Sequence, residues 1–428
     1  MADRTFGIET LCLHAGQIPD PATGARAAPI YQTTSFVFDS ADHAASLFNL
    51  QTFGNVYSRI SNPTVAVFEE RMAAIENGRA AVAVASGQAA EAAAILTLCE
   101  QGDHVVSAST LYGGTHTLLD VNLRKLGIDT TFVHPDAPEN FRAALRKNTK
   151  LIYAETLGNP LINLVDIEAL AAIAHDAGIP LVVDNTVPSP YLCRPFEWGA
   201  DIVVHSATKY LGGHGTTMGG VVVESGRFPW DNGNFPGMTE PSKGYHGVRF
   251  YETFGDFGYT MRLRMETMRT FGPALSPLNA WLLLQGVESL HVRMDRHCAN
   301  ALAVAQHLQA HPKVAWVNYP GLPDNKYHAL AQKYLPKGAS GLLNFGVRGS
   351  ADAGQKFIEA AQFMSHLVNI GDAKTLISHP ASTTHRQMSE EEQRKAGVTP
   401  DMVRMSVGIE SIDDLLWDID QALHAATH

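Results

Sequence analysis

The sequence has little of what stabilises small extracellular proteins or forms metal centres. Only 4 of its 428 residues are cysteines, and they are scattered without CxxC spacing, which argues against a disulfide framework or a zinc cluster. No HExxH pattern is present, and His379 and His385 are not four residues apart, so we expect no metal site. The cysteines are predicted to be buried, reduced thiols.

Long hydrophobic runs are also lacking. The first residues, MADRTFGIET, contain no apolar core of the kind that forms a signal peptide. Nowhere do about eighteen uncharged apolar residues follow one another, as a membrane-spanning helix would require. These absences predict a cytoplasmic protein without a membrane-spanning segment.

Basic residues are in the minority. The 32 lysines and arginines are outnumbered by 43 aspartates and glutamates, the formal net charge is -11, and no long basic run occurs. This balance argues against a nucleic acid or an anionic membrane as partner, because both bind clustered positive charge. We therefore expect a small-molecule partner.

The middle of the chain contains short apolar runs that alternate with stretches of helical periodicity, such as residues 89–100, 139–147 and 167–177. The runs are AAVAVA, HVVS, TTFV, LIYAE, PLVVD, DIVVH and GGVVV. This alternation is typical of a mostly parallel sheet covered by helices, and it predicts an α/β fold.

The two ends of the chain differ from this middle part. Residues 1–65 are rich in turn residues and are predicted to form an irregular arm. After residue 270 the sequence shows a long helical stretch at 289–310, shorter mixed elements and an amphipathic helix at 413–425. We therefore expect an amino-terminal arm (1–65), a large domain (66–270) and a smaller α+β domain (271–428).

Ligands of such sheets bind beyond the carboxyl ends of the strands, so polar residues directly after the apolar runs are the first candidates for a site. The run AAVAVA is followed by Ser86, Gly87 and Gln88, where an alanine-rich helix is predicted to begin. Free backbone N–H groups at that helix end could bind an anion such as a phosphate. A serine cap with a turn glycine is commonplace, so the pattern alone does not establish a phosphate site.

A carboxylate and a lysine follow two later runs. Asp184 ends PLVVD, where a buried carboxylate needs a cationic or hydrogen-bonded partner such as a protonated ring nitrogen. DIVVH continues into Ser206, Thr208 and Lys209, so two hydroxyls suited to a phosphate lie beside a lysine that burial would make nucleophilic. Taken singly, Asp184 could be a turn cap and Lys209 a solvated lysine.

Two more candidates follow other strands. Asn159, in ETLGNP, can offer an amide hydrogen bond, and Tyr112, in LYGGT, could stack on a planar ring. A turn asparagine and a packed core tyrosine are the ordinary alternatives. A phosphate turn, an aromatic ring, an amide, a carboxylate and a lysine after successive strands nevertheless point together to a pyridoxal 5'-phosphate site.

Eight segments carry a resemblance to a known family. They are YSRISNPT (57–64), ASGQAA (85–90), LYGGT (111–115), ETLGNP (155–160), VVDNT (182–186), HSATKYLGGH (205–214), HPASTTH (379–385) and RMSVGIE (404–410). In these segments the sequence resembles the Cys/Met-metabolism family of pyridoxal-phosphate enzymes, and the likeness covers nearly the whole chain. It implies the fold of aspartate aminotransferase (fold type I), with a large, mostly parallel α/β domain and a smaller α+β carboxy-terminal domain.

The resemblance also implies roles for individual residues. Lys209 would form a Schiff base with the cofactor, Asp184 would keep the pyridine nitrogen protonated, and Tyr112 would stack on the ring, so that these three are the expected catalytic residues. Asn159 would bond the ring oxygen. The phosphate would be held by Gly87, Gln88, Ser206 and Thr208, and by Tyr57 and Arg59 of a neighbouring subunit.

Several departures within the family favour one reaction. Gln88 stands where lyases and cystathionine synthases of the family usually have methionine, and residues 229–250 are extra relative to shorter relatives. Asn369 and Gly114 stand where γ-lyase-like members usually carry serine and cysteine. The resemblance therefore implies that O-acetyl-L-homoserine and sulfide are the substrates, and that they give L-homocysteine and acetate.

In this reaction Arg404 would grip the substrate carboxylate and Asn369 would contribute to substrate binding. The alternatives that stay open are O-succinylhomoserine as the ester, a cystathionine γ-synthase, a methionine γ-lyase and a non-catalytic carrier of the cofactor. Arg59 and Arg404 could also be surface ion-pair partners. If Arg59 does serve a neighbour, the catalytic unit is a dimer, and we expect a homotetramer, a dimer of dimers, in solution.

Overall fold

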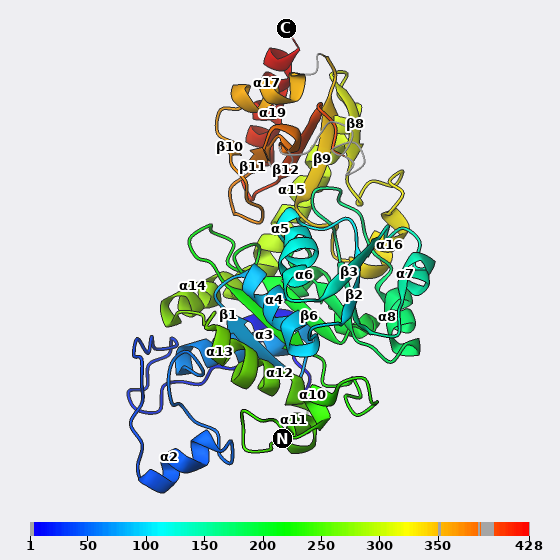
Figure 1. Ribbon diagram of the computed structural model, residues 1–428. Coiled ribbons are helices and arrows are strands. Elements are labelled where there is room, and N and C mark those ends of the chain that lie inside the picture. Colours follow the sequence, from blue (N-terminus) through cyan, green and yellow to red (C-terminus); the bar gives the residue numbers. More distant parts are fainter. Residues whose placement is uncertain (1–3, 350–351, 384–385, 387–397, 428) are drawn as a thin grey trace.

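The protein contains two sheets, each flanked by helices, and an arm that extends from the larger body (Figure 1). The computed structural model describes residues 4–349, 352–383, 386 and 398–427. The larger sheet lies in the middle of the molecule, the smaller sheet lies in the carboxy-terminal part, and the helix α2 of the arm lies far from both.

The larger sheet has seven strands and is mostly parallel. Its spatial order is β1 (Ala80–Val84), β7 (Gly220–Glu224), β6 (Ile202–Ser206), β5 (Leu181–Asp184), β4 (Thr149–Glu155), β2 (His104–Ala108) and β3 (Asp129–Val133). Only β7 runs antiparallel to its neighbours β1 and β6. Each predicted apolar run forms one strand, because side chains without charge can be buried by helices on both faces.

Helices cover both faces of this sheet. The longer ones are α3 (Pro63–Glu76), α4 (Gly87–Leu98) and α8 (Ile167–Asp176). The shorter ones are α5 (Gly113–Thr117), η1 (Leu118–Asn122), α6 (Leu123–Lys125), α7 (Glu139–Ala144), α9 (Ser189–Leu192), η2 (Pro195–Trp198), α10 (Pro236–Thr239), α11 (Phe250–Phe254), η3 (Gly255–Phe257), α12 (Gly258–Arg262), η4 (Leu263–Met268) and α13 (Arg269–Phe271).

The predicted helix at residues 139–147 is too long. Helix α7 ends at Ala144, and Leu145 already has an extended backbone. The side chain of Thr149 accepts the backbone N–H of Arg146 at 2.7 Å, which fixes a turn where the helix was expected to continue.

The smaller sheet mixes parallel and antiparallel pairs. Its order is β10 (Ser365–His366), β11 (Leu376–Ser378), β12 (Met402–Ser406), β9 (Leu342–Val347) and β8 (Val314–Asn318). The accompanying helices are α14 (Pro277–Glu288), α15 (Leu290–Ala310), α16 (His328–Tyr334), α17 (Ala353–Ala360), η5 (Pro380–Ser382) and α19 (Ile412–Ala426). Helices α15 and α19 correspond to the predicted long and amphipathic helices. The domain boundaries at residues 65 and 270 stay predictions.

The arm is less irregular than expected, because it contains the helices α1 (Ile8–His14) and α2 (Ala41–Phe48). Helix α1 buries Ile8 and Cys12 against the core, and Ser40 caps α2 by accepting the N–H of His43 at 3.0 Å. The rest of the arm is open. Its exposed large apolar side chains are Ile18, Ile30, Tyr31, Val37, Phe38, Phe48, Phe53 and Tyr57.

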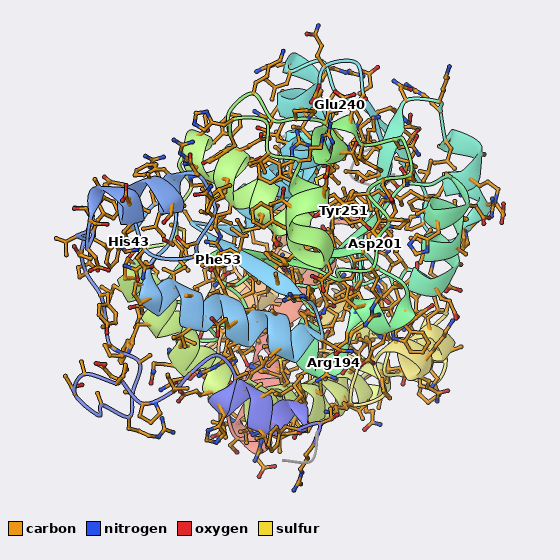
Figure 2. The ribbon with its side chains drawn as sticks, turned by 90° about the horizontal axis from the view of Figure 1, so that it is seen from below. His43, Phe53, Arg194, Asp201, Glu240 and Tyr251 are labelled. Carbon is orange, nitrogen blue, oxygen red and sulfur yellow. The ribbon has the colours of Figure 1, made fainter. Side chains whose placement is uncertain are left out.

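One arm residue returns to the body. The centroid of the Phe53 ring lies 6.5 Å from that of Phe254 and 6.3 Å from that of Phe257. Phe53 lies on the side of the molecule that carries α11 (Figure 2). Phe53 is still 75% exposed, so these contacts cover little of it. The arm therefore presents an apolar surface that the described part of the chain leaves uncovered.

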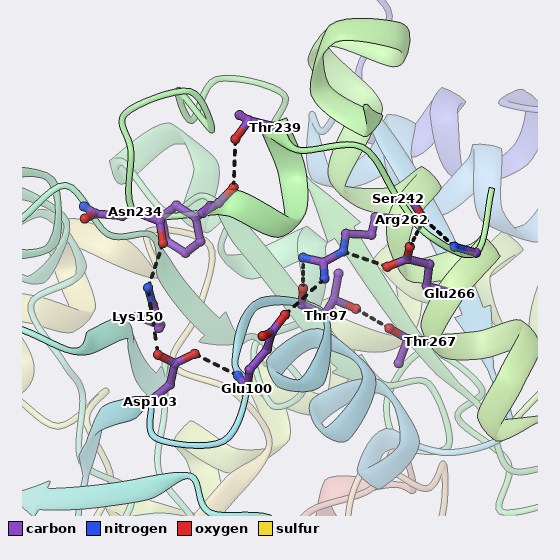
Figure 3. Close-up of polar contacts among 12 residues, drawn as sticks. Thr97, Glu100, Asp103, Lys150, Asn234, Thr239, Ser242, Arg262, Glu266 and Thr267 are labelled. Carbon is purple, nitrogen blue, oxygen red and sulfur yellow. Dashed lines mark hydrogen bonds and ion pairs between the residues drawn. The ribbon is translucent and has the colours of Figure 1, made fainter. Parts of the chain in front are cut away.

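The segment 229–250 is folded onto the large domain. Trp230 is 2% exposed and stacks on Tyr259, with ring centroids 5.3 Å apart. Figure 3 shows two polar anchors: Lys150 Nζ donates to the backbone oxygen of Asn234 at 2.7 Å, and Ser242 Oγ donates to Glu266 at 2.6 Å. These contacts make the segment part of the packed structure rather than a loose loop.

Three observations concern features that the sequence lacks. All four cysteines are buried and unpaired. Among the described helices, none is long and apolar enough to cross a membrane. The same residues contain no cluster of three or more potential metal ligands, and His385 lies outside the described residues.

Replacing Trp230 by alanine should destabilise the protein by about 3–5 kcal/mol, because it removes a large buried ring from a packed site. Denaturant unfolding of the purified variant measures the change. Trp417→Ala is the control, since Trp417 is 54% exposed on α19 and its loss should change the free energy of unfolding by only about 0.5 kcal/mol. Equal effects of the two substitutions would contradict this account of the segment 229–250.

Candidate active site

A cavity opens where the carboxyl ends of the parallel strands face the carboxy-terminal part of the chain. Its empty volume is about 980 Å³, part of which is open to solvent. The large domain contributes Ser86, Gly87, Gln88, Glu91, Tyr112, Glu155, Leu157, Asn159, Asp184, Thr186, Val187, Ser206, Thr208, Lys209 and Met218. The carboxy-terminal part contributes Val368, Asn369, Ile370 and Arg404.

The amino-terminal end of α4 forms one wall of the cavity. Ser86 caps the helix by accepting the N–H of Ala89 at 3.1 Å. A Cβ on Gly87 would lie 2.6 Å from the Cβ of Ser206, so glycine allows the helix end to approach the end of β6. With Thr208 close by in the same wall, free N–H groups and hydroxyls converge on a place where a phosphate group fits.

Lys209 follows β6 and extends into the cavity. Its Nζ donates a hydrogen bond to Asn369 Oδ1 at 2.5 Å. Burial, and secondarily the charge of Arg404, lowers the pKa of the Lys209 amine to about 8. A substantial share of the amine is therefore neutral near physiological pH, as a lysine that attacks an aldehyde requires.

Arg404 enters the cavity from β12 and is 6% exposed. Its Nη1 donates to Asn159 Oδ1 at 3.0 Å, and its Nη2 donates to the backbone oxygen of Asn369 at 3.3 Å. Burial lowers the pKa of the guanidinium to about 10, so the group stays charged at neutral pH. It provides a fixed positive charge beside Lys209.

Carboxyl groups also line the cavity. Asp184 accepts the N–H of Thr186 at 2.8 Å, and Glu155 accepts the N–H of Tyr112 at 2.7 Å. Burial raises the pKa of Asp184, and burial together with the charge of Asp184 raises the pKa of Glu155 well above its usual value. A carboxylate in this position is stabilised by a cation, and a protonated pyridine ring nitrogen is a cation of suitable size.

The cavity thus has a cationic end and a carboxyl end, with a phosphate seat in its wall. Pyridoxal phosphate has complementary groups: an aldehyde for Lys209, a ring nitrogen for Asp184 and a phosphate for the end of α4. The residues of this chain therefore fit the cofactor.

The predicted site residues lie in this cavity, except for Tyr57 and Arg59. Tyr112 is 47% exposed rather than packed in the core, so its ring is accessible to a ligand. Arg59 lies over the Tyr57 ring, 5.4 Å from its centroid, and donates from Nη1 to the backbone oxygen of Arg269. The roles assigned to individual residues stay predictions.

Two acidic residues of the cavity were not among the predicted site residues. Glu155 is the last residue of a buried strand, a place where a carboxylate already signals a partner. Glu91 is the only charged residue of α4, whose sequence is GQAAEAAAILTL. The sequence did contain a signal for Glu91: it is a single acidic residue in an alanine-rich helix that begins at a predicted phosphate site.

Comparisons with known proteins agree with this site. Residues 9–424 match the family described as Cys/Met metabolism PLP-dependent enzyme. The O-acetyl-L-homoserine sulfhydrylase of Leptospira meyeri is 53% identical over 98% of this chain and 97% of its own length, and the homocysteine synthase of Schizosaccharomyces pombe is 52% identical over 98% of both.

A crystal structure from Campylobacter jejuni, described as an O-acetylhomoserine (thiol)-lyase with N'-pyridoxyl-lysine-5'-monophosphate, is similar with a TM-score of 0.95. It is 41% identical and covers 98% of this chain and 100% of its own. This likeness confirms the expected fold type I architecture. The protein is a pyridoxal-phosphate-dependent enzyme. It belongs to the Cys/Met metabolism family.

The lowered pKa of Lys209 predicts how the cofactor-free protein regains its cofactor. The rate of reaction with pyridoxal phosphate should rise with pH and level off above about pH 8, because the amine must lose its proton before it attacks. Visible absorbance of the lysine-bound cofactor measures the rate, and Lys209→Ala should give no such signal. A rate that keeps rising to about pH 10, as for an ordinary lysine, would contradict the buried environment.

Proposed function

We propose that this enzyme replaces the acetoxy group at Cγ of O-acetyl-L-homoserine by sulfide and so produces L-homocysteine and acetate. One observation carries the proposal: a buried Lys209 amine donates to Asn369 and is close to the Arg404 charge, in a cavity that Asp184 also lines. The names of the relatives support the choice of substrates. The reaction belongs to the formation of sulfur-containing amino acids.

The cofactor would be held by several elements at once. Its phosphate would lie at the end of α4 beside Ser206 and Thr208, its ring nitrogen at Asp184, and its ring against Tyr112. Asn159 would bond the ring oxygen. When bound, pyridoxal phosphate withdraws electrons from the substrate's Cα, which makes proton removal there possible.

Lys209 would move protons during the reaction. After the substrate's amino group has taken its place on the cofactor, the free amine can accept the Cα proton and return it, and a pKa of about 8 suits both directions near neutral pH. The hydrogen bond to Asn369 directs the amine toward the cavity. Asn369 therefore lies beside the amine that would carry the proton.

Arg404 would bind the substrate carboxylate. Its guanidinium has five N–H donors, and the bonds to Asn159 and to the Asn369 carbonyl use only part of them. These bonds fix the plane of the group, so the remaining donors can meet a carboxylate in a defined orientation. The substrate's Cα is then held close to Lys209.

Gly114 supports replacement rather than γ-elimination. A Cβ at this position would lie 2.6 Å from Cε1 of Tyr112 and 3.3 Å from Cδ of Gln88. The cysteine that γ-lyase-like members usually carry here does not fit unless the Tyr112 ring moves. The arrangement of Tyr112 in this protein therefore depends on glycine.

Assays with pairs of substrates test the proposed reaction. With sulfide, O-acetyl-L-homoserine should give a kcat/KM at least about tenfold higher than O-succinyl-L-homoserine, since the two acyl groups differ in size and charge. Cysteine should be a poorer acceptor than sulfide, and methionine should yield no α-keto acid. A preference for the succinyl ester or for cysteine, or rapid keto-acid release, would overturn the assignment; Lys209→Ala is the inactive control.

We further propose that two copies share each active site and that the protein is a homotetramer, a dimer of dimers. Tyr57 and Arg59 do not line the cavity of their own chain, and they lie in an arm with many exposed apolar side chains. A second copy would cover this surface and receive Tyr57 and Arg59 at its phosphate seat. Closed symmetry is the usual arrangement for such reciprocal contacts.

A cytoplasmic location is also proposed. Its support is the state of the four cysteines, which are buried and unpaired. Thiols of this kind suit a reducing compartment.

Mixing two inactive variants tests the shared site. Arg59→Ala and Lys209→Ala proteins, combined under conditions of subunit exchange, should regain part of the wild-type activity. Each mixed dimer would contain one site with both wild-type residues, so an equal mixture should approach about a quarter of wild-type activity if exchange is random. Verified exchange without recovery would place Arg59 in the site of its own chain.

A further inference from the structure

Glu91 lies at the carboxyl end of the cavity, one turn into α4. It is 4% exposed and lines the cavity together with Asp184 and Glu155. Three acidic side chains from three different elements therefore share one buried space. Only one cationic ring nitrogen is expected there.

Glu91 accepts a hydrogen bond from a neutral side chain rather than from a cationic one. Gln88 Nε2 donates to Glu91 Oε2 at 2.8 Å. The hydroxyls of Thr115 and Tyr153 lie alongside, and Thr115 is near enough to both Glu91 and Tyr153 to favour their ionised forms. The bond to Glu91 also fixes the orientation of the Gln88 amide in the wall of the cavity.

No cation of the described residues is paired with Glu91. The titratable groups that face it are Asp184 from β5 and Glu155 and Tyr153 from β4. On β6, His205 is already bonded to Glu76 at 2.5 Å. The charged neighbour of Lys209 is Arg404, at the opposite end of the cavity.

An unpaired carboxylate in such surroundings is costly, so the neutral acid is the stable form. Burial is the main cause that raises the pKa of Glu91 well above its usual value, and the charge of Asp184 adds to it. Hydrogen bonding with Thr115 and Gln88 acts in the opposite direction but does not reverse the shift. At Asp184, hydrogen bonds from the side chain and backbone of Thr186 favour the ionised form.

We propose that Glu91 is protonated in the working enzyme, where it positions Gln88 and leaves Asp184 as the single anion that faces the cofactor's ring nitrogen. The inference rests on the proposed placement of that nitrogen at Asp184. It makes Glu91 a positioning residue that also sets the charge of this end of the cavity.

The proposal has a measurable consequence. Because Glu91 keeps its proton both with and without the cofactor, cofactor binding neither releases nor takes up a proton at this position. By linkage, the affinity of the wild type should therefore have the same pH dependence as that of a variant that cannot ionise there. Glu91→Gln is such a variant, because glutamine has nearly the shape of the neutral acid.

The test compares dissociation constants of pyridoxal phosphate for wild type and Glu91→Gln between about pH 6 and 9.5. The two should agree within about twofold over the whole range, because neither protein exchanges a proton at this position on binding. A wild-type affinity that rises with pH relative to Glu91→Gln would overturn the proposal, because Glu91 would then lose its proton when the cofactor binds. A large loss of affinity in Glu91→Gln already at pH 6 would also overturn it, because Glu91 would then be ionised.

Two further variants distinguish the role of Glu91 from the placement of the ring nitrogen at Asp184. Glu224→Gln is the matched control: Glu224 is 2% exposed, burial raises its pKa to about 7, and Thr260 binds it away from the cavity. It should leave the affinity ratio unchanged. Asp184→Asn should weaken binding throughout the pH range; if it does not, the placement of the ring nitrogen fails. Weaker binding of Asp184→Asn together with a wild-type affinity that rises with pH relative to Glu91→Gln refutes only the role of Glu91.

The cofactor-free protein offers a second measurement that does not depend on binding. A raised pKa in the folded state means that stability present below about pH 4.5 is lost as pH rises. The free energy of unfolding of the wild type should therefore fall relative to Glu91→Gln as the pH rises above about 4.5. Parallel curves for the two proteins would contradict a neutral Glu91.

Discussion

Charge separation inside a buried cavity is the constraint on which the proposed chemistry depends. Lys209 and Arg404 provide the positive charges of the cavity, Asp184, Glu91 and Glu155 provide its carboxyl groups, and burial shifts the pKa of each toward its neutral form. Such an arrangement is costly when the charges face no partner. A ligand that brings a ring cation to the carboxyl end and reacts with the amine at the other end removes much of that cost.

The fold creates this separation by bringing two sheets together. The carboxyl ends of β5 and β6 supply Asp184 and Lys209, while β12 of the smaller sheet supplies Arg404. The bond between Arg404 and Asn159 joins the two parts across the cavity. Because Arg404 and Asn369 come from the carboxy-terminal part and Lys209 and Asp184 from the large domain, the reactive geometry depends on how the two parts pack.

Much of the site could be predicted from the sequence, since Asp184 and Lys209 directly follow apolar runs with a clear strand pattern. The contact between Lys209 and Asn369 could not, because 160 residues separate them and no local spacing encodes their packing. Glu91 was missed because burial inside a helix depends on what covers that helix. Helix α1 was missed because it is short and its stability comes from packing of Ile8 and Cys12 rather than from periodicity.

The most direct test of the account is a crystal structure of the protein with pyridoxal phosphate. We expect continuous density from Nζ of Lys209 to the cofactor, the ring nitrogen within about 3 Å of the Asp184 carboxylate, and the phosphate at the amino-terminal end of α4. A ring bound in the opposite sense, with its phosphate toward Asp184 or its aldehyde away from Lys209, would contradict the charge-separated site.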